Sequence, residues 1–382
     1  MARFIFLSLT LLAARPPALS AADKFEFKGG DKVVLIGSTL IEREQRYGYW
    51  EAALTARNPD KNITFRNLGW SGDNVWGEAR AGFGTVADGY KHLIDHVKAE
   101  KPTVIIVGYG TNESFAGPAG LPKFKEQLKK LLDDLSVTKA RFVLLSPMKM
   151  QKIPPPLPDP AKANANLSSY AFEIRQEAVR REAEFIDLFI RGACQTENGQ
   201  HPTALGYWGT ADWLFNAPFP GEGLLDIVTV RVKNTPSKPV RLKLTGARLP
   251  VVYEGRSIPE NSLRIEITDL APGNYSLQID QKNVLTATAA EWAEGKIRAD
   301  PDLDQADQLR QAIIAKNELY FHRWRPQNVT YLFGFRKYEQ GNNAIEIPKF
   351  DPLIEAKEKE IAKLRVPREH VYELVPAKEE KK

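Results

Sequence analysis

The sequence contains little cysteine, little histidine and no long apolar run beyond its N-terminus. A single cysteine among 382 residues, Cys194, allows no internal disulfide, so the fold must depend on its hydrophobic core. The chain lacks the run of about 18 apolar residues that a membrane-spanning helix needs, so we predict no transmembrane segment. Lysine and arginine form no dense stripe, and the formal net charge is only +5. We therefore expect no nucleic-acid partner.

Residues 1–22 have the pattern of a secretory signal peptide. Arg3 supplies a short positive region, an apolar stretch follows, and the small residues of 18–22 suit a cleavage site. Cleavage would remove Arg3 and Arg15 and no acidic residue, so the net charge would fall from +5 to +3. An uncleaved N-terminal anchor is the alternative. We expect export to the periplasm or the medium.

The first half of the mature chain has the pattern of an α/β domain. Short apolar runs predict strands that are buried on both faces, and amphipathic stretches between them predict helices. The predicted strands are Lys32–Ile36, Ile63–Leu68, Val104–Val107, Arg141–Leu145 and Phe185–Leu188, and the predicted helices are 43–57, 86–99, 121–135 and 166–184. This alternation indicates a flavodoxin-like, three-layer α/β/α fold with a parallel sheet over residues 23–216. The proline-rich segment 151–165 could form a rim over a pocket or a stiff surface connector.

The second half of the sequence has a different pattern of apolar residues. Residues 216–221 resemble a linker, and several short strand patterns follow it, which predicts a β-sandwich-like domain over 222–292. The predicted strands are 226–233, 239–245, 263–268, 274–280 and 283–288. A helical extension is predicted over 300–382, with a helix at 303–324 and, from residue 354, a solvated helix followed by a disordered end.

Four short segments combine the residue types needed for ester cleavage. Gly37–Leu40 (GSTL), Gly69–Asp73 (GWSGD) and Gly110–Glu113 (GTNE) each follow a predicted strand. Carboxyl ends of parallel strands meet at one edge of a sheet, where sites in such folds lie. Asn198–Pro202 (NGQHP) adds His201, one of only five histidines. A hydroxyl, a base and oxyanion donors are the parts of an acyl-transfer site.

The order and spacing of these segments resemble the four blocks of the SGNH (GDSL-type) hydrolase family, over residues 31–215. The resemblance implies that Thr39 is the nucleophile and His201 the general base. It also implies that the backbone N–H of Gly72 and the side-chain amide of Asn112 stabilise the oxyanion, together with the N–H of the nucleophile.

Two blocks depart from the family pattern. The first reads GST where the family has GDS, so a threonine with a rotamer-restricting methyl group stands at the serine position. Ser38, one residue earlier, is the alternative nucleophile. In the last block Asn198 replaces the orienting aspartate, a change that costs about 10⁴ in kcat in a serine protease because it favours the wrong histidine tautomer. Glu197 or Asp187 could orient the ring instead.

Neighbouring side chains complete the predicted site. Trp70, Tyr109 and Glu113 are assigned to substrate binding, because aromatic faces suit sugar rings; packing in the core is the alternative for the aromatic residues. His92 and His96 lie four residues apart on one predicted helix, a spacing that suits a metal. No third ligand is evident in the sequence, so we predict no metal and no other cofactor.

The resemblance extends to exported planctomycete-type proteins that carry threonine at the nucleophile position and an end similar to NELYFHRWRPQN, residues 317–328. It implies an exported ester hydrolase that removes acetyl or other short acyl groups from a small molecule or a glycan. A catalytically weak protein that binds a glycan or a partner is one alternative. An acyltransferase, which passes the acyl group to a sugar hydroxyl, is another. The sequence indicates no oligomeric state.

Overall fold

The computed structural model describes residues 25–191, 194–216, 228–233, 240–244, 249–250, 252–253, 262–299, 301–339, 341 and 343–377. The predicted signal peptide, residues 1–22, lies outside these ranges, as do residues 217–221 of the predicted linker. The start of the predicted β-rich region, residues 222–227, lies outside them too.

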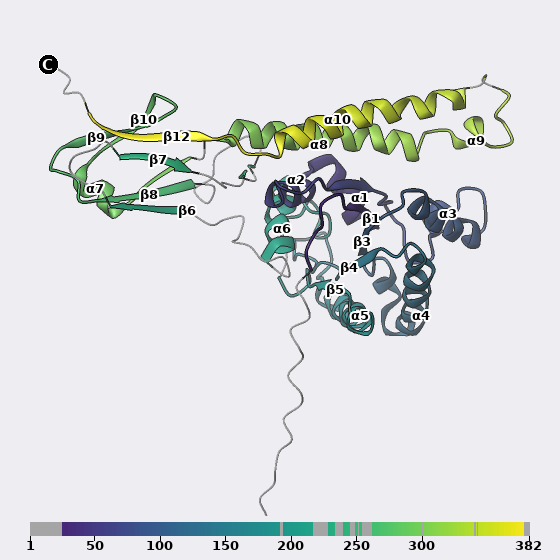
Figure 1. Cartoon of the computed structure of the whole chain (residues 1–382). Coiled ribbons are helices and arrows are strands. Elements are labelled where there is room, and N and C mark those ends of the chain that lie inside the picture. Colours follow the sequence, from purple (N-terminus) through teal and green to yellow (C-terminus); the bar gives the residue numbers. More distant parts are fainter. Residues whose placement is uncertain are drawn as a thin grey trace, which may run out of the picture.

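The N-terminal half is a three-layer α/β/α domain built on a five-stranded parallel sheet of order β2-β1-β3-β4-β5, which confirms the predicted fold (Figure 1). The strands are β1 (Lys32–Gly37), β2 (Thr64–Asn67), β3 (Val104–Gly108), β4 (Arg141–Leu145) and β5 (Glu184–Ile186). The helices are α1 (Thr39–Tyr47), α2 (Tyr49–Arg57), α3 (Val86–Ala99), α4 (Gly117–Ser136), α5 (Ala161–Arg180) and α6 (Ala204–Asn216), with single turns η1 (Glu78–Arg80) and η2 (Glu113–Ala116).

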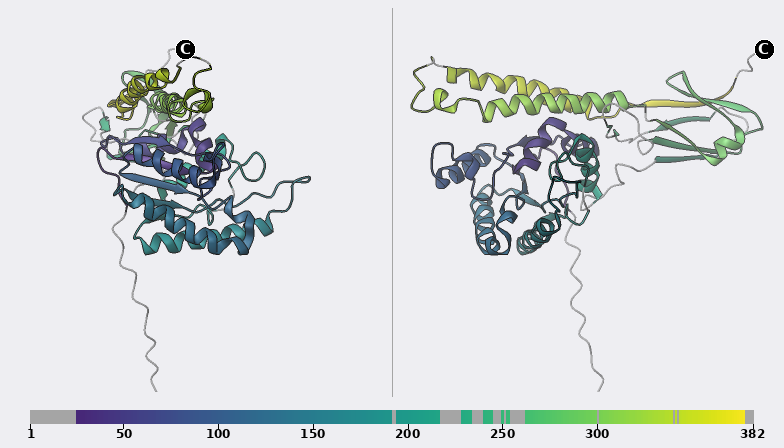
Figure 2. Two further views of the ribbon diagram at one scale, coloured as in Figure 1. Left: turned by 90° about the vertical axis from the view of Figure 1, so that its right-hand side faces the viewer. Right: turned by 180° about the vertical axis from the view of Figure 1, so that it is seen from behind.

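Alternate residues of strand β1 face two separate cores. Val33 and Leu35 pack with residues of α2 and α6, whereas Val34 and Ile36 pack with residues of α3, α4 and α5. The strands are therefore buried on both faces, as their continuous apolar runs indicate. Figure 2 shows helices on both sides of the sheet.

The predicted boundaries of three helices, 43–57, 121–135 and 166–184, differ from the observed ones. The predicted helix 43–57 starts at Thr39 and is broken into α1 and α2 by Gly48, which has a left-handed φ of 65°. A Cβ at Gly48 would lie 3.1 Å from Ile314, so the break lets a distant helix approach closely. The predicted helix 166–184 is observed as α5, which begins five residues earlier, at Ala161, and ends at Arg180. Pro160 directly precedes that helix, a position at which proline is tolerated.

The C-terminal half contains two small sheets around one core. One has the order β10-β9-β12-β7 and the other β11-β8-β6, and Trp292 is fully buried between them with Ile265, Leu277 and Tyr372. The elements are β6 (Val228–Lys233), β7 (Val240–Leu244), β8 (Ser262–Thr268), β9 (Asn274–Ile279), β10 (Lys282–Thr288), α7 (Ala289–Glu294), β11 (Lys296–Ala299) and β12 (His370–Pro376). The strand β12 comes from the tail predicted to be disordered, and it pairs with both β9 and β7.

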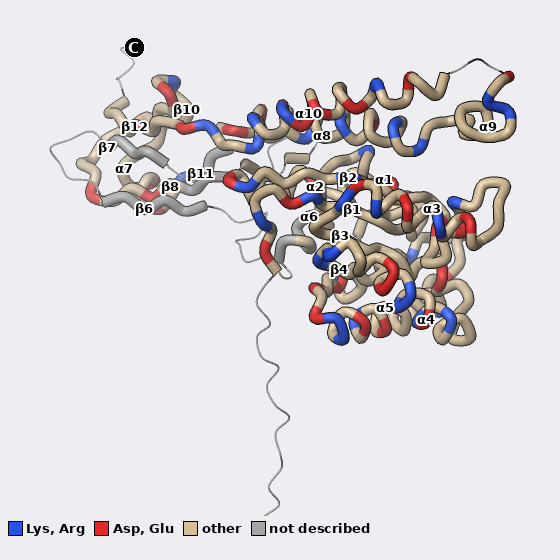
Figure 3. Tube along the Cα trace, turned by 45° about the vertical axis from the view of Figure 1, so that its right-hand side comes forward, with Lys and Arg blue, Asp and Glu red and all other residues tan. Residues whose placement is uncertain are grey.

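A long helical hairpin joins the two halves. It consists of α8 (Leu303–Trp324), the predicted helix with the same bounds, and α10 (Phe350–Leu364), with α9 (Val329–Leu332) and the turn η4 (Asn343–Lys349) between them. Both views show α8 lying along the layer of α1 and α2 (Figures 1 and 2). Charges of both signs alternate along the hairpin (Figure 3). Within the described ranges, no helix is long and apolar enough to cross a membrane.

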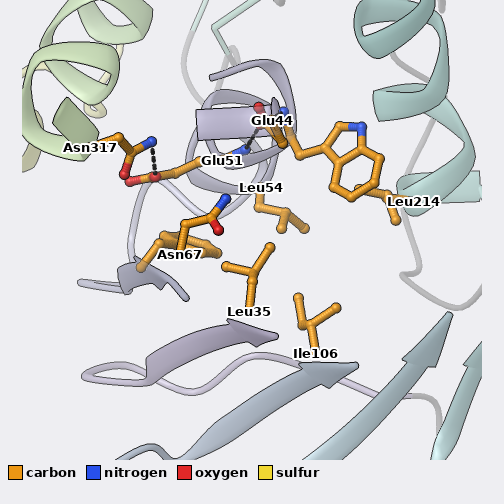
Figure 4. A pocket seen from close by; sticks show the side chains of 10 residues that line it. Leu35, Glu44, Glu51, Leu54, Asn67, Ile106, Leu214 and Asn317 are labelled. Atoms are coloured by element: carbon orange, nitrogen blue, oxygen red, sulfur yellow. Dashed lines mark hydrogen bonds between the residues drawn. The ribbon is translucent and has the colours of Figure 1, made fainter. Parts of the chain in front are cut away.

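A small buried cavity of about 20 Å³ lies between α2, α8 and the sheet (Figure 4). Leu35, Leu54 and Ile106 form its apolar floor, and the side chains of Glu51 and Asn317 meet at its rim through a hydrogen bond of 3.2 Å. Thr39, Gly72, Asn112 and His201 do not line it. The cavity therefore belongs to the junction of the hairpin with the domain rather than to the predicted catalytic blocks.

Candidate active site

The turn from β1 to α1 presents Thr39 at the edge of the sheet. Gly37 has no room for a side chain, because a Cβ there would lie 2.5 Å from the carbonyl oxygen of Gly108. Ser38 is buried at the N-cap position, and Thr39, half-buried, is the first residue of the nine-residue helix α1. The free N–H groups and the partial positive charge of a helix N-terminus favour an oxyanion at this point.

The second and third blocks meet beside Thr39. The backbone N–H of Gly72 donates a hydrogen bond to Thr39 Oγ1 at 3.3 Å, so this donor already lies next to the predicted nucleophile. The side-chain amide of Asn112 donates to the carbonyl oxygen of Asp73 at 2.7 Å, which joins the third block to the second. Thr39, Gly72 and Asn112, whose blocks each follow a predicted strand, thus lie together at one edge of the sheet.

Tyr109 and Glu113, both predicted to bind substrate, are placed beneath the loops. Tyr109 is 1% exposed and donates its hydroxyl to Asp73 Oδ2 at 3.0 Å. Glu113 is 6% exposed and accepts the backbone N–H groups of Val75 and Gly110, each at 2.8 Å. Burial raises the pKa of Glu113 to about 7. Both side chains therefore hold the loops of the second and third blocks in place from the core side.

A buried ion pair lies under the same loops. Arg80 Nε donates to Asp73 Oδ2 at 2.7 Å, and both side chains are fully buried. Arg80 also donates to the carbonyl oxygen of Leu68 at 2.8 Å. Neither Asp73 nor Arg80 was predicted to belong to the site from the sequence. Asp73 is the last residue of the GWSGD block, so its position in that motif could have indicated its role.

The last block places the amide of Asn198 against the ring of His201. Asn198 Oδ1 accepts the backbone N–H groups of His201 at 2.9 Å and Gln200 at 3.2 Å. Because these two donors fix the orientation of the amide, Asn198 Nδ2 faces His201 Nδ1, at 3.2 Å. An N–H group facing Nδ1 requires that nitrogen to be the acceptor, so the proton of neutral His201 lies on Nε2.

The nucleophile and the base do not contact each other through a hydrogen bond among the described residues: Thr39 bonds to Gly72 and His201 to Asn198. The two alternative orienting carboxylates have other partners. Asp187 Oδ1 accepts the N–H of Ile190 at 3.0 Å, whereas Glu197 pairs with Arg43 at 2.6 Å. Glu197 still acts on His201 electrostatically, since it raises the pKa of the ring.

Comparison with known families agrees with this arrangement. Residues 32–208 match the model of the GDSL-like Lipase/Acylhydrolase family. These residues form a GDSL-like domain. They make up less than half of the chain, and the match ends before the C-terminal sheets and the hairpin. A comparison with curated proteins gives no match.

Two solved structures are similar to this chain to different degrees. A gut microbial diltiazem-metabolizing enzyme aligns with a TM-score of 0.68 and 16% identity, over 92% of this chain and 99% of its own. An acetylxylan esterase from Geobacillus stearothermophilus aligns with a TM-score of 0.42 and 15% identity, over 51% of this chain and 97% of its own. The similarity to the diltiazem-metabolizing enzyme extends beyond the GDSL-like domain, so the fold of the C-terminal half is also found in that enzyme.

The two histidines of α3 contact groups other than each other's ring nitrogens. His92 Nδ1 lies 3.0 Å from the carbonyl oxygen of Arg80, and His96 packs against Trp324 with ring centroids 5.4 Å apart. In the part of the chain that the structure describes, no cluster of three His, Cys, Asp or Glu side chains could hold a metal ion.

The electrostatics of the GDSL-like domain keep His201 neutral. Burial and the nearby Arg43 guanidinium lower the pKa of His201 below its usual 6.5, and they outweigh the opposing effect of Glu197. A base must be unprotonated, so we expect the acidic limb of the kcat/KM profile for ester hydrolysis to have its midpoint below pH 6.5.

Replacing Arg43 by glutamine should move this acidic limb to higher pH. The variant removes a cation that lowers the pKa of His201 and leaves Glu197 unpaired, and both changes favour the protonated ring. The measurement is the pH profile of kcat/KM for Arg43→Gln beside Arg46→Gln, a control at an exposed position of the same helix. An unmoved limb in Arg43→Gln would contradict the assignment of His201 as the base.

Proposed function

We propose that this protein is an exported hydrolase that removes short acyl groups, acetyl above all, from a carbohydrate. The observation that carries the proposal is the hydrogen bond from the Gly72 N–H to Thr39 Oγ1, inside a domain of a lipase and acylhydrolase family. It puts an oxyanion donor next to a hydroxyl at a helix N-terminus, which is the arrangement that acyl transfer needs.

In the proposed reaction Thr39 Oγ1 forms a bond to the ester carbonyl carbon while His201 Nε2 accepts the hydroxyl proton. The oxyanion is stabilised by the N–H groups of Gly72 and Thr39 and by the Asn112 amide. His201 then returns the proton to the departing sugar oxygen, and water releases the acyl group by the reverse sequence. Phe115, 63% exposed and three residues after Asn112, supplies an aromatic face that suits a sugar ring.

A glycan-binding protein with weak catalysis is the second candidate, and one observation favours it. The amide of Asn198 stabilises the His201 tautomer that carries its proton on Nε2, so the nitrogen that should accept the proton of Thr39 is already occupied. The base must change tautomer before it can act, at the expense of that hydrogen bond.

The test is hydrolysis of an aryl acetate and an acetylated glycan by the purified protein. In subtilisin, removing the catalytic histidine lowers kcat about 10²-fold further than removing the aspartate does. Because the aspartate is already replaced here, we expect Thr39→Ala and His201→Ala each to lose about 10²-fold in kcat. Activity that survives Thr39→Ala but not His201→Ala would identify Ser38 as the nucleophile. Wild-type rates equal to those of His201→Ala would reject the hydrolase and leave the binding protein.

A further inference from the structure

A segment from far outside the GDSL-like domain contacts the turn that carries Gly72. The helix α8 ends at Trp324, and the guanidinium carbon of the next residue, Arg325, lies 3.5 Å from the centroid of the Trp70 ring. Trp324 packs edge-on against the same ring, with centroids 5.8 Å apart. Two consecutive residues of the C-terminal hairpin thus cover the indole of the second catalytic block, a close cation–π and aromatic contact.

Glu42 links Arg325 to the helix of the nucleophile and to the same turn. It lies three residues after Thr39 on α1, and its carboxylate is buried. Its Oε2 accepts a hydrogen bond from Arg325 at 3.0 Å and another from the backbone N–H of Ser71, the residue before Gly72. One carboxylate oxygen therefore joins the hairpin, the nucleophile helix and the oxyanion turn.

The geometry of this turn depends on such contacts. A Cβ at Gly69 would lie 2.4 Å from the backbone nitrogen of Glu42, so the turn lies directly against α1. Gly72 has a left-handed φ of 78°, and a Cβ there would have nothing within 4 Å, so no packing on its own side holds it. Two ion pairs fix the turn: Asp73–Arg80, which is fully buried, and Glu42–Arg325.

We propose that Arg325 is a positioning residue of the ester-hydrolase site, acting through Glu42 and Trp70 to hold the Gly72 N–H at the oxyanion position. The inference rests on the proposed function and deepens it. It makes the helical hairpin, which lies beyond the match to the family model, a part of the catalytic apparatus. A displacement of about 1 Å in such a group can cost about 10²-fold in rate, so a small shift of the turn would suffice.

The experiment compares Arg325→Ala, Arg325→Lys and Arg323→Ala in the full chain. Arg323 lies two residues earlier and pairs with Asp351 of α10 at 2.7 Å, so its loss weakens the hairpin without touching Trp70 or Glu42. For Arg325→Ala we expect a fall of about 10- to 100-fold in kcat on an aryl acetate, with KM within about twofold. Arg325→Lys keeps the charge but not the planar face and should fall between Arg325→Ala and wild type. Arg323→Ala should match wild type.

Amide hydrogen exchange gives a second readout that needs no activity. In Arg325→Ala the amides of a peptide spanning 69–73 should exchange at least about tenfold faster than in wild type, because the variant releases the Ser71 and Gly72 amides. In Arg323→Ala their exchange rate should equal that of wild type. Equal exchange in both variants, or equal kcat, would overturn the inference. If wild type hydrolyses no ester, the proposed function fails and exchange alone decides the role of Arg325. If Arg325→Ala does not fold, Arg325→Lys decides by the same two readouts.

Discussion

Replacing Asn198 by aspartate is expected to raise the kcat of ester hydrolysis by about 10³- to 10⁴-fold, the reverse of the loss that the opposite change causes in a serine protease. The backbone N–H groups of His201 and Gln200 now hold Asn198 Oδ1, which leaves only the amide N–H to face His201 Nδ1. An aspartate can keep both backbone bonds with one oxygen and accept from Nδ1–H with the other. The ring then presents an unprotonated Nε2 to Thr39.

Removing His201 provides the control for Asn198→Asp. Asn198→Asp combined with His201→Ala should show no gain over His201→Ala alone, because the new carboxylate acts only through the imidazole ring. The acidic limb of the pH profile should also move upward in Asn198→Asp, since an adjacent carboxylate favours the protonated ring. A change in kcat smaller than about twofold would mean that the tautomer does not limit the reaction.

This outcome separates the two candidate functions. A large gain would show that Thr39, Gly72 and Asn112 are ready for catalysis and that the last block alone restrains the enzyme. No gain, together with a wild type that hydrolyses no ester, would indicate that the site has been adapted to bind an ester or a glycan without cleaving it.

The sequence predicts the parts of this site that depend on local chain order. Thr39, Gly72 and Asn112 follow buried strands, and parallel strands bring their carboxyl ends together whatever lies elsewhere in the chain. The helix 303–324 is equally predictable, because its apolar residues recur with helical spacing over 22 residues. The orientation of the Asn198 amide could not be predicted, since it depends on two backbone donors within its own loop.

The missed features depend on contacts between distant segments. Gly48 interrupts a continuous helical pattern because Ile313 and Ile314 approach it, and nothing near Gly48 in sequence signals that approach. The strand β12 follows a run of lysine and glutamate that is typical of a solvated end, and only its pairing with β7 and β9 orders it. The contact of Arg325 with Trp70 has the same long-range character.

The buried ion pair that fastens the hairpin to the domain leads to a second large prediction. Lys316, 0% exposed, donates to both oxygens of Glu51 at 2.8 and 2.9 Å and to the carbonyl oxygen of Phe65 at 3.0 Å. Replacing Lys316 by methionine leaves the Glu51 carboxyl buried without its cation, beside the cavity of Figure 4. Removing one partner of such a pair costs about 3–5 kcal/mol, so we expect a loss of that size in the free energy of unfolding.

Burial raises the pKa of Glu51 and Lys316 opposes the rise, so without Lys316 the carboxyl is driven towards its neutral form. Lys316→Met combined with Glu51→Gln should therefore recover much of the lost stability in chemical denaturation, because the amide carries no charge and still accepts from Asn317. Lys357→Met, which breaks a more exposed pair with Glu360 on α10, should cost less than about 1 kcal/mol. A Lys316→Met variant as stable as Lys357→Met would contradict the prediction and mean that apolar packing of α8 on α2 holds the hairpin by itself.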